Sequence, residues 1–294
     1  MKTVLFAALA LAGAWFLSVW ASAITGELRR NLPRWRSSGV GFVTNVFDTL
    51  GIGSFATTSA FFKLWGMVED DQIPGTLMVG HTPPSLLQAY IFIAVVAVDP
   101  ATLMLMIASS AAGSWLGAGI VSRLPRDKIR TGMGTALLGA AVLMTMNQLH
   151  WIPGGGEGVG LSGAALALAV VGNMILGALM TLGIGLYAPC MILVSLLGMS
   201  PRAAFPIMTG SCAALMSVGS IPFIRSGRYS LKAALGLTAG GIPGVLLAAF
   251  VVKSLPLAAV RWLVVAVVIY TGSMMLRSAV IERRTGLASV AAQA

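Results

Sequence analysis

Long apolar segments separated by short polar ones run through the whole chain. Several of them reach the roughly 18 to 20 residues that a helix needs to cross about 30 Å of hydrocarbon. The pattern therefore predicts an all-α polytopic membrane protein. The apolar segments that we expect to be helical lie at 3–24, 39–66, 75–98, 101–121, 130–148, 164–199, 203–224, 231–252 and 257–277.

Two of these segments are unusually long and carry glycines near their middle. As one helix, residues 39–66 would extend about 42 Å, which is more than the hydrocarbon core requires. Gly51 and Gly53 can interrupt that helix, because glycine is a poor helix former and tolerates irregular backbone. Gly183 and Gly185 stand in the same place in the second long segment. We therefore expect each segment to form two half-helices that fold into a re-entrant hairpin.

The two breaks belong to a duplicated unit. The sequence Thr49-Leu50-Gly51-Ile52-Gly53 recurs letter for letter 132 positions later, as residues 181–185. Later in the chain the distance between matching residues falls to 131 positions, where Leu124-Pro125 aligns with Leu255-Pro256. The predicted organisation is an N-terminal transmembrane helix with a basic cytoplasmic loop (1–38), a first repeat (39–148), a linker (149–163), a second repeat (164–278) and a cytoplasmic tail (279–294).

Charge supports the membrane assignment and orients the segments. Only 10% of the residues are charged, against about 25% in soluble domains. The net charge of +10 is read as a topology signal in basic loops, so no nucleic-acid partner is expected. If each broken segment returns to its starting side, 14 Lys and Arg face the cytoplasm and 4 face out; full crossings would give 10 and 8. The hairpins are favoured, and three further crossings per repeat then make the two repeats inverted.

The N-terminal segment allows a second interpretation. Residues 3–24 follow Lys2 and end in Ala21-Ser22-Ala23, which resembles a signal peptide with its cleavage site. Cleavage would leave the basic cluster at 29–36 outside the cell, against the positive-inside tendency. We therefore prefer a first transmembrane helix in a multi-pass protein of the cell (plasma or inner) membrane, and cleavage of residues 1–23 stays open.

The two breaks suggest an anion site. Each second half-helix begins near Gly53 or Gly185, so its free N–H groups and positive dipole end point into the centre of the bundle. Two such ends can bind a small anionic substrate without a buried cation. Glycines that only permit close helix packing are the alternative. The candidate substrate-binding residues around the breaks are Thr49, Gly51, Gly53, Ser54, Thr57 and Thr58 in the first repeat, and Thr181, Gly183, Gly185, Tyr187 and Cys190 in the second.

Two titratable residues join this candidate set. Asp48 is a carboxylate inside a membrane segment, which is costly and marks a functional candidate. It could carry the proton that couples transport, although a cation could be the coupling ion instead. The alternative is a structural role, in which Asp48 bonds to Lys63 or to a helix end. His81 lies near the start of the next helix and can change charge near neutral pH. A histidine satisfied by packing is the alternative there.

No cofactor, metal site or enzymatic activity is expected. Cys190 and Cys212 both lie in apolar segments, and the two histidines are far apart in the sequence. Gly160-Leu161-Ser162-Gly163 spells the G-x-S-G of rhomboid-type intramembrane proteases. That chemistry needs a histidine base close to the serine, and His81 belongs to the other repeat while His150 lies in a loop. We therefore expect a non-enzymatic membrane protein.

Three stretches of the chain form a family-like pattern: the glycine-rich residues 41–53 and 177–185, and the later Leu197-Gly198-Met199-Ser200-Pro201-Arg202-Ala203-Ala204. In these stretches the chain resembles the sulfite exporter TauE/SafE family of membrane transporters. The sequence departs from the family pattern at Ser54-Phe55 and Leu186-Tyr187, where further glycines are usual. Membership implies a secondary transporter or exporter of sulfur-containing anions such as sulfite or organosulfonates. An anion channel of the same architecture and a non-transporting membrane scaffold are the alternatives.

Overall fold

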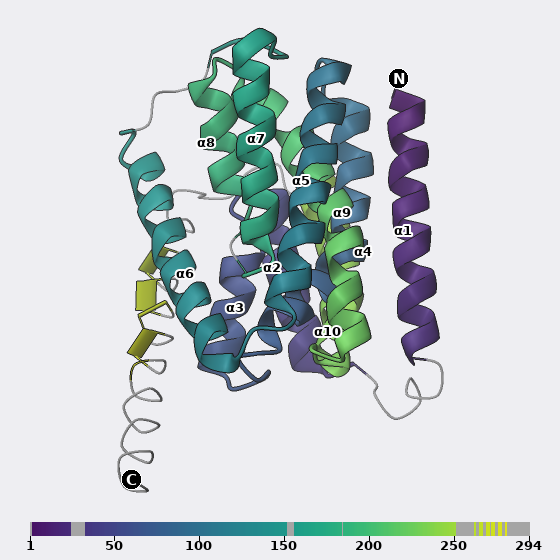
Figure 1. The fold of residues 1–294 in the computed structure, drawn as a ribbon, viewed down its shortest axis with the longest axis vertical. Coiled ribbons are helices and arrows are strands. Elements are labelled where there is room, and N and C mark those ends of the chain that lie inside the picture. The colour runs from purple at the N-terminus through teal and green to yellow at the C-terminus, as the bar shows by residue number, and fades with distance from the viewer. Residues whose placement is uncertain are drawn as a thin grey trace, which may run out of the picture.

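A computed structural model describes residues 2–24, 33–151, 156–183 and 185–250, together with ten separate positions between 262 and 280. All the regular elements in these ranges are helices, arranged as one bundle (Figure 1). The helix predicted at 257–277 lies mostly outside the described residues, and so does the predicted tail. The described helices are α1 (Lys2–Ile24), α2 (Trp35–Thr49), α3 (Phe55–Leu64), α4 (Ile73–Val95), α5 (Pro100–Val121), α6 (Arg126–Gln148), α7 (Gly163–Met180), α8 (Tyr187–Leu196), α9 (Pro201–Ser226) and α10 (Leu231–Phe250).

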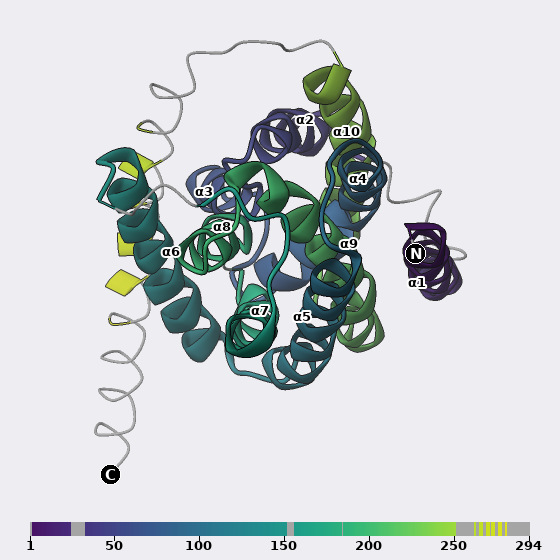
Figure 2. The same cartoon turned by 90° about the horizontal axis from the view of Figure 1, so that it is seen from above.

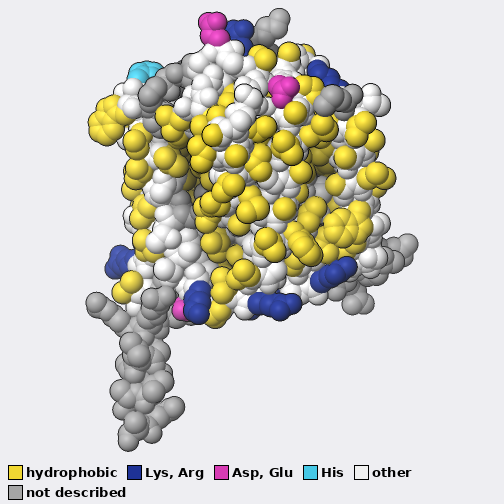
Figure 3. Space-filling model, turned by 45° about the horizontal axis from the view of Figure 1, so that its top comes forward, with side chains coloured by type: hydrophobic (Ala, Val, Ile, Leu, Met, Phe, Trp, Pro, Cys, Tyr) yellow, Lys and Arg dark blue, Asp and Glu magenta, His cyan; other side chains and the backbone are white. Residues whose placement is uncertain are grey.

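Six of these helices are long and apolar enough to cross a membrane, namely α1, α5, α6, α7, α9 and α10. Helix α4 is as long, but it carries polar side chains such as Gln88 that the surrounding helices bury completely. The space-filling view shows an apolar band with charged side chains gathered toward its edges (Figure 3). This distribution fits the multi-pass membrane protein that the sequence predicts.

Both long segments are broken at the predicted glycines. Helix α2 ends at Thr49 and α3 begins at Phe55, while α7 ends at Met180 and α8 begins at Tyr187. Gly51, Gly53 and Gly183 have φ angles of 80°, 95° and 91°. This left-handed region is available to glycine at little cost and strains other residues. The repeated pentapeptide therefore ends a helix twice, because its glycines allow the chain to turn.

The loops lie at two ends of the bundle. At one end, which we call the basic end, the Ser230 amide donates to the Thr76 hydroxyl, and the Arg228 guanidinium donates to the Leu124 carbonyl. At the other, the linker end, the Asp99 amide donates to the Val159 carbonyl, 2.8 Å away. The basic end contains loops 65–72, 122–125 and 227–230, and the linker end contains loops 96–99, 156–162 and 197–200.

Each broken pair begins and ends at a single end of the bundle. Ser37, near the start of α2, packs against Gly236, near the start of α10, so α2 begins at the basic end. Helix α3 also ends there, in loop 65–72. Helix α7 begins and α8 ends at the linker end, where the Ser200 amide donates to the Gly158 carbonyl. The two pairs therefore point into the bundle from opposite ends (Figure 1).

The helix pairing repeats the duplication. Helix α2 packs closely against α10, and α7 packs in the same way against α5. A Cβ atom at Gly244 would overlap the Phe42 carbonyl, and one at Gly113 would overlap the Met174 carbonyl. Phe42 and Met174 are 132 positions apart, and the two glycines are 131 apart, as the sequence alignment requires. Small residues at these crossings let the backbones approach, as is common between membrane helices.

Helix α1 lies at the edge of the bundle, where it contacts α9 and α4 (Figure 2). Its Phe16 and Trp20 pack with Val79 and Ile224 in a small cluster separate from the main core. The Tyr90 hydroxyl donates to the Phe6 carbonyl and joins α4 to α1. Helix α1 is therefore attached to the bundle along one side, through α9 and α4.

Candidate functional site

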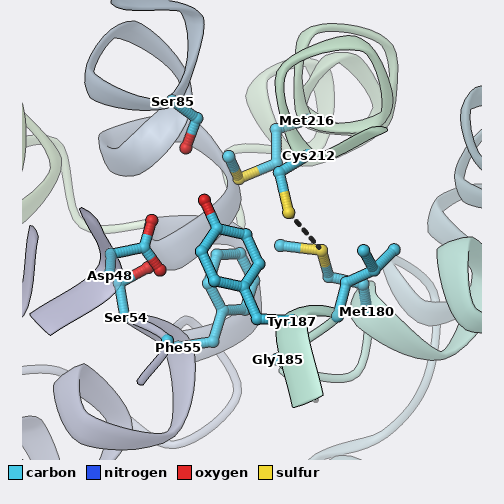
Figure 4. Close-up of a pocket in the computed structure, with 11 residues that line it drawn as sticks. Asp48, Ser54, Phe55, Ser85, Met180, Gly185, Tyr187, Cys212 and Met216 are labelled. Carbon is cyan, nitrogen blue, oxygen red and sulfur yellow. Dashed lines mark hydrogen bonds between the residues drawn. The ribbon is translucent and has the colours of Figure 1, made fainter. Parts of the chain in front are cut away.

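The two breaks meet at one small cavity, which we call the central cavity (Figure 4). Its volume is about 10 Å³. This is enough space for about one water molecule. The lining residues are Asp48, Gly53, Ser54, Phe55, Ser85, Met180, Gly185, Leu186, Tyr187, Cys212 and Met216. Eight of these form four pairs related by the repeat offset: Asp48 and Met180, Gly53 and Gly185, Ser54 and Leu186, Phe55 and Tyr187.

Two helix N-termini face this cavity. Ser54 and Leu186 stand at the N-cap positions of α3 and α8, and neither side chain caps its helix. The first N–H groups of a helix lack intrahelical partners and carry the positive end of its dipole. None of the lining residues in the described chain is Lys, Arg or His. The polar groups around the cavity are therefore backbone amides, hydroxyl groups and the Asp48 carboxylate, with no fixed cation among the described lining residues.

Asp48 already places a carboxylate at one of these helix ends. Its side chain is 4% exposed and interacts with the hydroxyl and backbone N–H of Ser54, and with Gln88 and Tyr187. The start of α3 thus lies beside Asp48 (Figure 4). Lys63 instead pairs with Asp70 at the basic end, with 2.6 Å between the charged atoms.

A chain of hydrogen bonds joins the two repeats beside the cavity. The Tyr187 hydroxyl, on α8, donates to the side-chain oxygen Oε1 of Gln88 at 2.6 Å. The side-chain nitrogen Nε2 of Gln88 donates to the Thr49 hydroxyl at 2.8 Å, and that hydroxyl donates to the backbone carbonyl of Asn45. This chain of hydrogen bonds links the start of α8 to α2 through Gln88 of α4.

His81 is fully buried and does not line the cavity. Both of its ring nitrogens have partners at 3.0 Å, the Asn45 amide at Nδ1 and the Thr58 hydroxyl at Nε2. Because the amide can only donate, Nδ1 accepts and Nε2 carries the hydrogen, which gives a neutral ring. His81 thus links α2, α3 and α4, and this arrangement matches the packing alternative.

The sequence-predicted residues fall into two groups. Asp48, Gly53, Ser54, Gly185 and Tyr187 line the central cavity. The others do not line it. Several make hydrogen bonds elsewhere: Thr49 to Gln88, Thr57 to the Gly53 carbonyl, Thr58 to His81, and Thr181 to the Ala178 carbonyl. Gly51 lies beside Phe205, Gly183 lies beside Met133, and Cys190 is fully buried.

Several lining residues were not predicted from the sequence. The repeat offset gives a signal for Phe55, Met180 and Leu186, because each is the counterpart of a predicted residue. Cys212 and Met216 lie one helical turn apart on α9, and the Cys212 thiol approaches the Met180 sulfur at 3.9 Å. Figure 4 shows these sulfur atoms on the wall opposite Asp48. Nothing in an apolar helix segment marks which face meets a cavity.

Comparison with models of protein families, with curated proteins and with solved structures found no match to this chain.

Proposed function

We propose that the chain is a secondary transporter of a small anion. The observation that carries this proposal is the central cavity, where equivalent positions of both breaks come together inside the bundle. Transporters built from repeats place their substrate where discontinuous helices meet near the middle of the membrane. The paired α3 and α8 ends match that arrangement.

The two repeats are proposed to be inverted, with re-entrant hairpins. Helix α2 begins and α3 ends at the basic end, whereas α7 begins and α8 ends at the linker end. Basic residues favour a cytoplasmic position for the basic end. The described basic residues there include Arg34, Arg36, Lys63, Arg123, Lys128, Arg225, Arg228 and Lys232, against Lys2 and Arg202 at the linker end.

The substrate class follows from the chemistry of the cavity and from the family resemblance. Backbone amides at helix ends and hydroxyl groups bind oxyanions without a fixed cation. The resemblance to the TauE/SafE family narrows the proposal to a sulfur oxyanion or organosulfonate, such as sulfite or sulfoacetate. A cavity for about one water is too small for sulfite, so the repeats must move apart to admit it. Rocking of one repeat against the other would provide alternating access.

Asp48 is proposed to couple this transport to protons. Its carboxylate interacts with the Ser54 amide at the start of α3, where an anion would bind. An ionised Asp48 would repel that anion, and like charges placed together cost several kcal/mol. Protonation removes the repulsion, so one proton would accompany each anion.

Flux measurement in liposomes tests the proposal. The purified protein is reconstituted, and uptake of radiolabelled sulfite or sulfoacetate is followed against protein-free liposomes. We expect uptake that saturates with concentration. Uptake that does not saturate would indicate a channel. Absence of flux for every small anion tested, with folded protein, would overturn the proposal and favour a scaffold.

A further inference from the structure

A second, larger cavity lies at the basic end between α1, α5 and α9. Its volume is about 420 Å³, within the roughly 300 to 1,000 Å³ of ligand pockets. Its lining includes Trp15, Trp115, Gly119, Arg123 and Arg225, and it shares no residue with the central cavity. We call it the peripheral cavity.

The polar part of the peripheral cavity carries two positive charges. Arg225 belongs to the last turn of α9, and Arg123 lies in the loop that follows α5. No Asp or Glu lines the cavity, and the ion pair recorded within the described chain joins Lys63 to Asp70 instead. Guanidinium groups match the geometry of phosphate oxygens. Two arginines without a lining carboxylate therefore favour an anionic group.

The remaining wall is mainly aromatic and apolar and extends away from the basic end, toward the middle of the apolar band. Trp15 is 43% exposed and Trp115 is 62% exposed, so the cavity lies at the outer surface. Trp15 is nine residues from the end of α1, which is about 13 Å along the helix. Tryptophan is enriched where membrane and water meet. The cavity thus extends from the level of charged headgroups to the level of hydrocarbon.

We propose that the peripheral cavity binds an anionic phospholipid. Its phosphate would lie between Arg123 and Arg225, and its glycerol and upper acyl chains would contact Trp15 and Trp115. A free phosphate ion would satisfy the arginines but would leave the aromatic wall without a partner. Basic pockets between transmembrane helices at the cytoplasmic side are suited to lipid headgroups. The bound lipid would join α1 to the α5 and α9 surface.

Lipid titration followed by native mass spectrometry tests this site. The delipidated full chain in detergent is titrated with phosphatidylglycerol or with phosphatidylcholine of the same acyl chains. We expect preferential retention of phosphatidylglycerol. Each arginine near the membrane surface strengthens binding about fivefold, so the double variant R123Q/R225Q should bind about 30-fold more weakly. Arg202→Gln, at the linker end, is the charge control and should retain the lipid.

Filling the cavity gives a test that leaves both charges in place. A Cβ at Gly119 would meet nothing within 4 Å, and the same holds for Gly139 on α6. Gly119→Leu should lose phosphatidylglycerol, while Gly139→Leu should keep it; gel filtration checks that all variants are folded. Equal retention of the two lipids, or unchanged retention by R123Q/R225Q, would overturn the proposal. Displacement of the lipid by millimolar inorganic phosphate would instead assign the site to a free anion.

Discussion

The second half-helices of the two breaks start at equivalent positions and differ in the side chains around them. Helices α3 and α8 start at equivalent positions, yet Asp48 and Ser54 in the first break correspond to Met180 and Leu186 in the second. Figure 4 shows the carboxylate and the sulfur groups on opposite walls of one cavity. The starts of α3 and α8 are therefore equivalent, while the chemistry of the side chains beside them is different. On this view both halves supply amides, and the first half supplies the group that can change charge.

The largest effects are expected where the backbones of paired helices touch. Gly113→Ala and Gly244→Ala would each push a Cβ into a carbonyl of the neighbouring helix, Met174 or Phe42. Because backbone cannot move aside as a side chain can, we expect each variant to lose about 3 kcal/mol of unfolding free energy. Unfolding in detergent measures this loss.

A matched control for these variants exists on α6. Gly139 lies in a helix with open space around its Cβ direction, so Gly139→Ala should be neutral or stabilising by up to about 1 kcal/mol. If only one of Gly113→Ala and Gly244→Ala destabilised the protein, the equivalence of the two helix pairs would be wrong.

The glycines of the two breaks should affect both stability and transport. Gly51 and Gly183 have φ angles of 80° and 91°, and alanine there costs roughly 1–2 kcal/mol. The strain would shift the start of α3 or α8 relative to the cavity. We therefore expect Gly51→Ala and Gly183→Ala to lose anion uptake in liposomes.

Two further glycines separate backbone strain from site geometry. Gly66 and Gly198 follow α3 and α8, have φ angles of 58° and 93°, and lie away from the cavity. Gly66→Ala and Gly198→Ala should be similarly destabilised and should still transport. Equal loss of uptake in all four variants would show that strain alone, and not the position of the breaks, is responsible.

The sequence predicted the breaks because their cause is local. A left-handed turn requires glycine, and the repeated pentapeptide supplies it twice. Helix ends were less accurate: α2 begins at Trp35 and α6 at Arg126, each four residues before the apolar segment. Polar residues at a membrane surface can extend a helix beyond its apolar part, so hydropathy underestimates the length.

The cavity lining could be predicted only in part because it depends on tertiary packing. Cys212 and Met216 resemble the other buried residues of α9, and no local pattern distinguishes the face that meets Asp48. His81 was a candidate because of its chemistry, and the structure places it outside the cavity lining with a partner at each ring nitrogen. Residue type identified candidates, and the packing of α4 and α9 decided which of them share a space.

Asp48 tests the divergence of the two breaks. Asp48→Asn removes the charge that would repel a bound anion, so we expect anion affinity at pH 8 to rise about tenfold or more. We also expect uptake by the variant to be independent of pH, whereas wild-type uptake should rise as pH falls. Met180→Leu, at the equivalent position, should leave affinity and pH dependence unchanged. Identical pH profiles for the wild type and Asp48→Asn would exclude the coupling role.

The start of α5 carries a helix cap outside the membrane core. Asp99 caps α5 by accepting from the Thr102 amide and hydroxyl, each at 2.8 Å. These bonds hold the pKa of Asp99 below its usual 3.8. The cap therefore stabilises the fold above about pH 4 and is lost as pH falls further. Asp99→Ala should cost about 1 kcal/mol at pH 7 and less at pH 3, as measured by unfolding in detergent.

The hydrogen bond between the repeats is expected to contribute least to stability. Tyr187→Phe removes the donor to Gln88, and hydrogen bonds between membrane helices average about 0.6 kcal/mol. Tyr90→Phe is the matched control, because its hydroxyl donates to the Phe6 carbonyl at 2.9 Å, away from the central cavity. Both variants should lose similar stability, and only Tyr187→Phe should change anion uptake. Equal uptake by the two variants would mean that the contact between the repeats serves packing alone, and that the chemical difference between the breaks resides in Asp48.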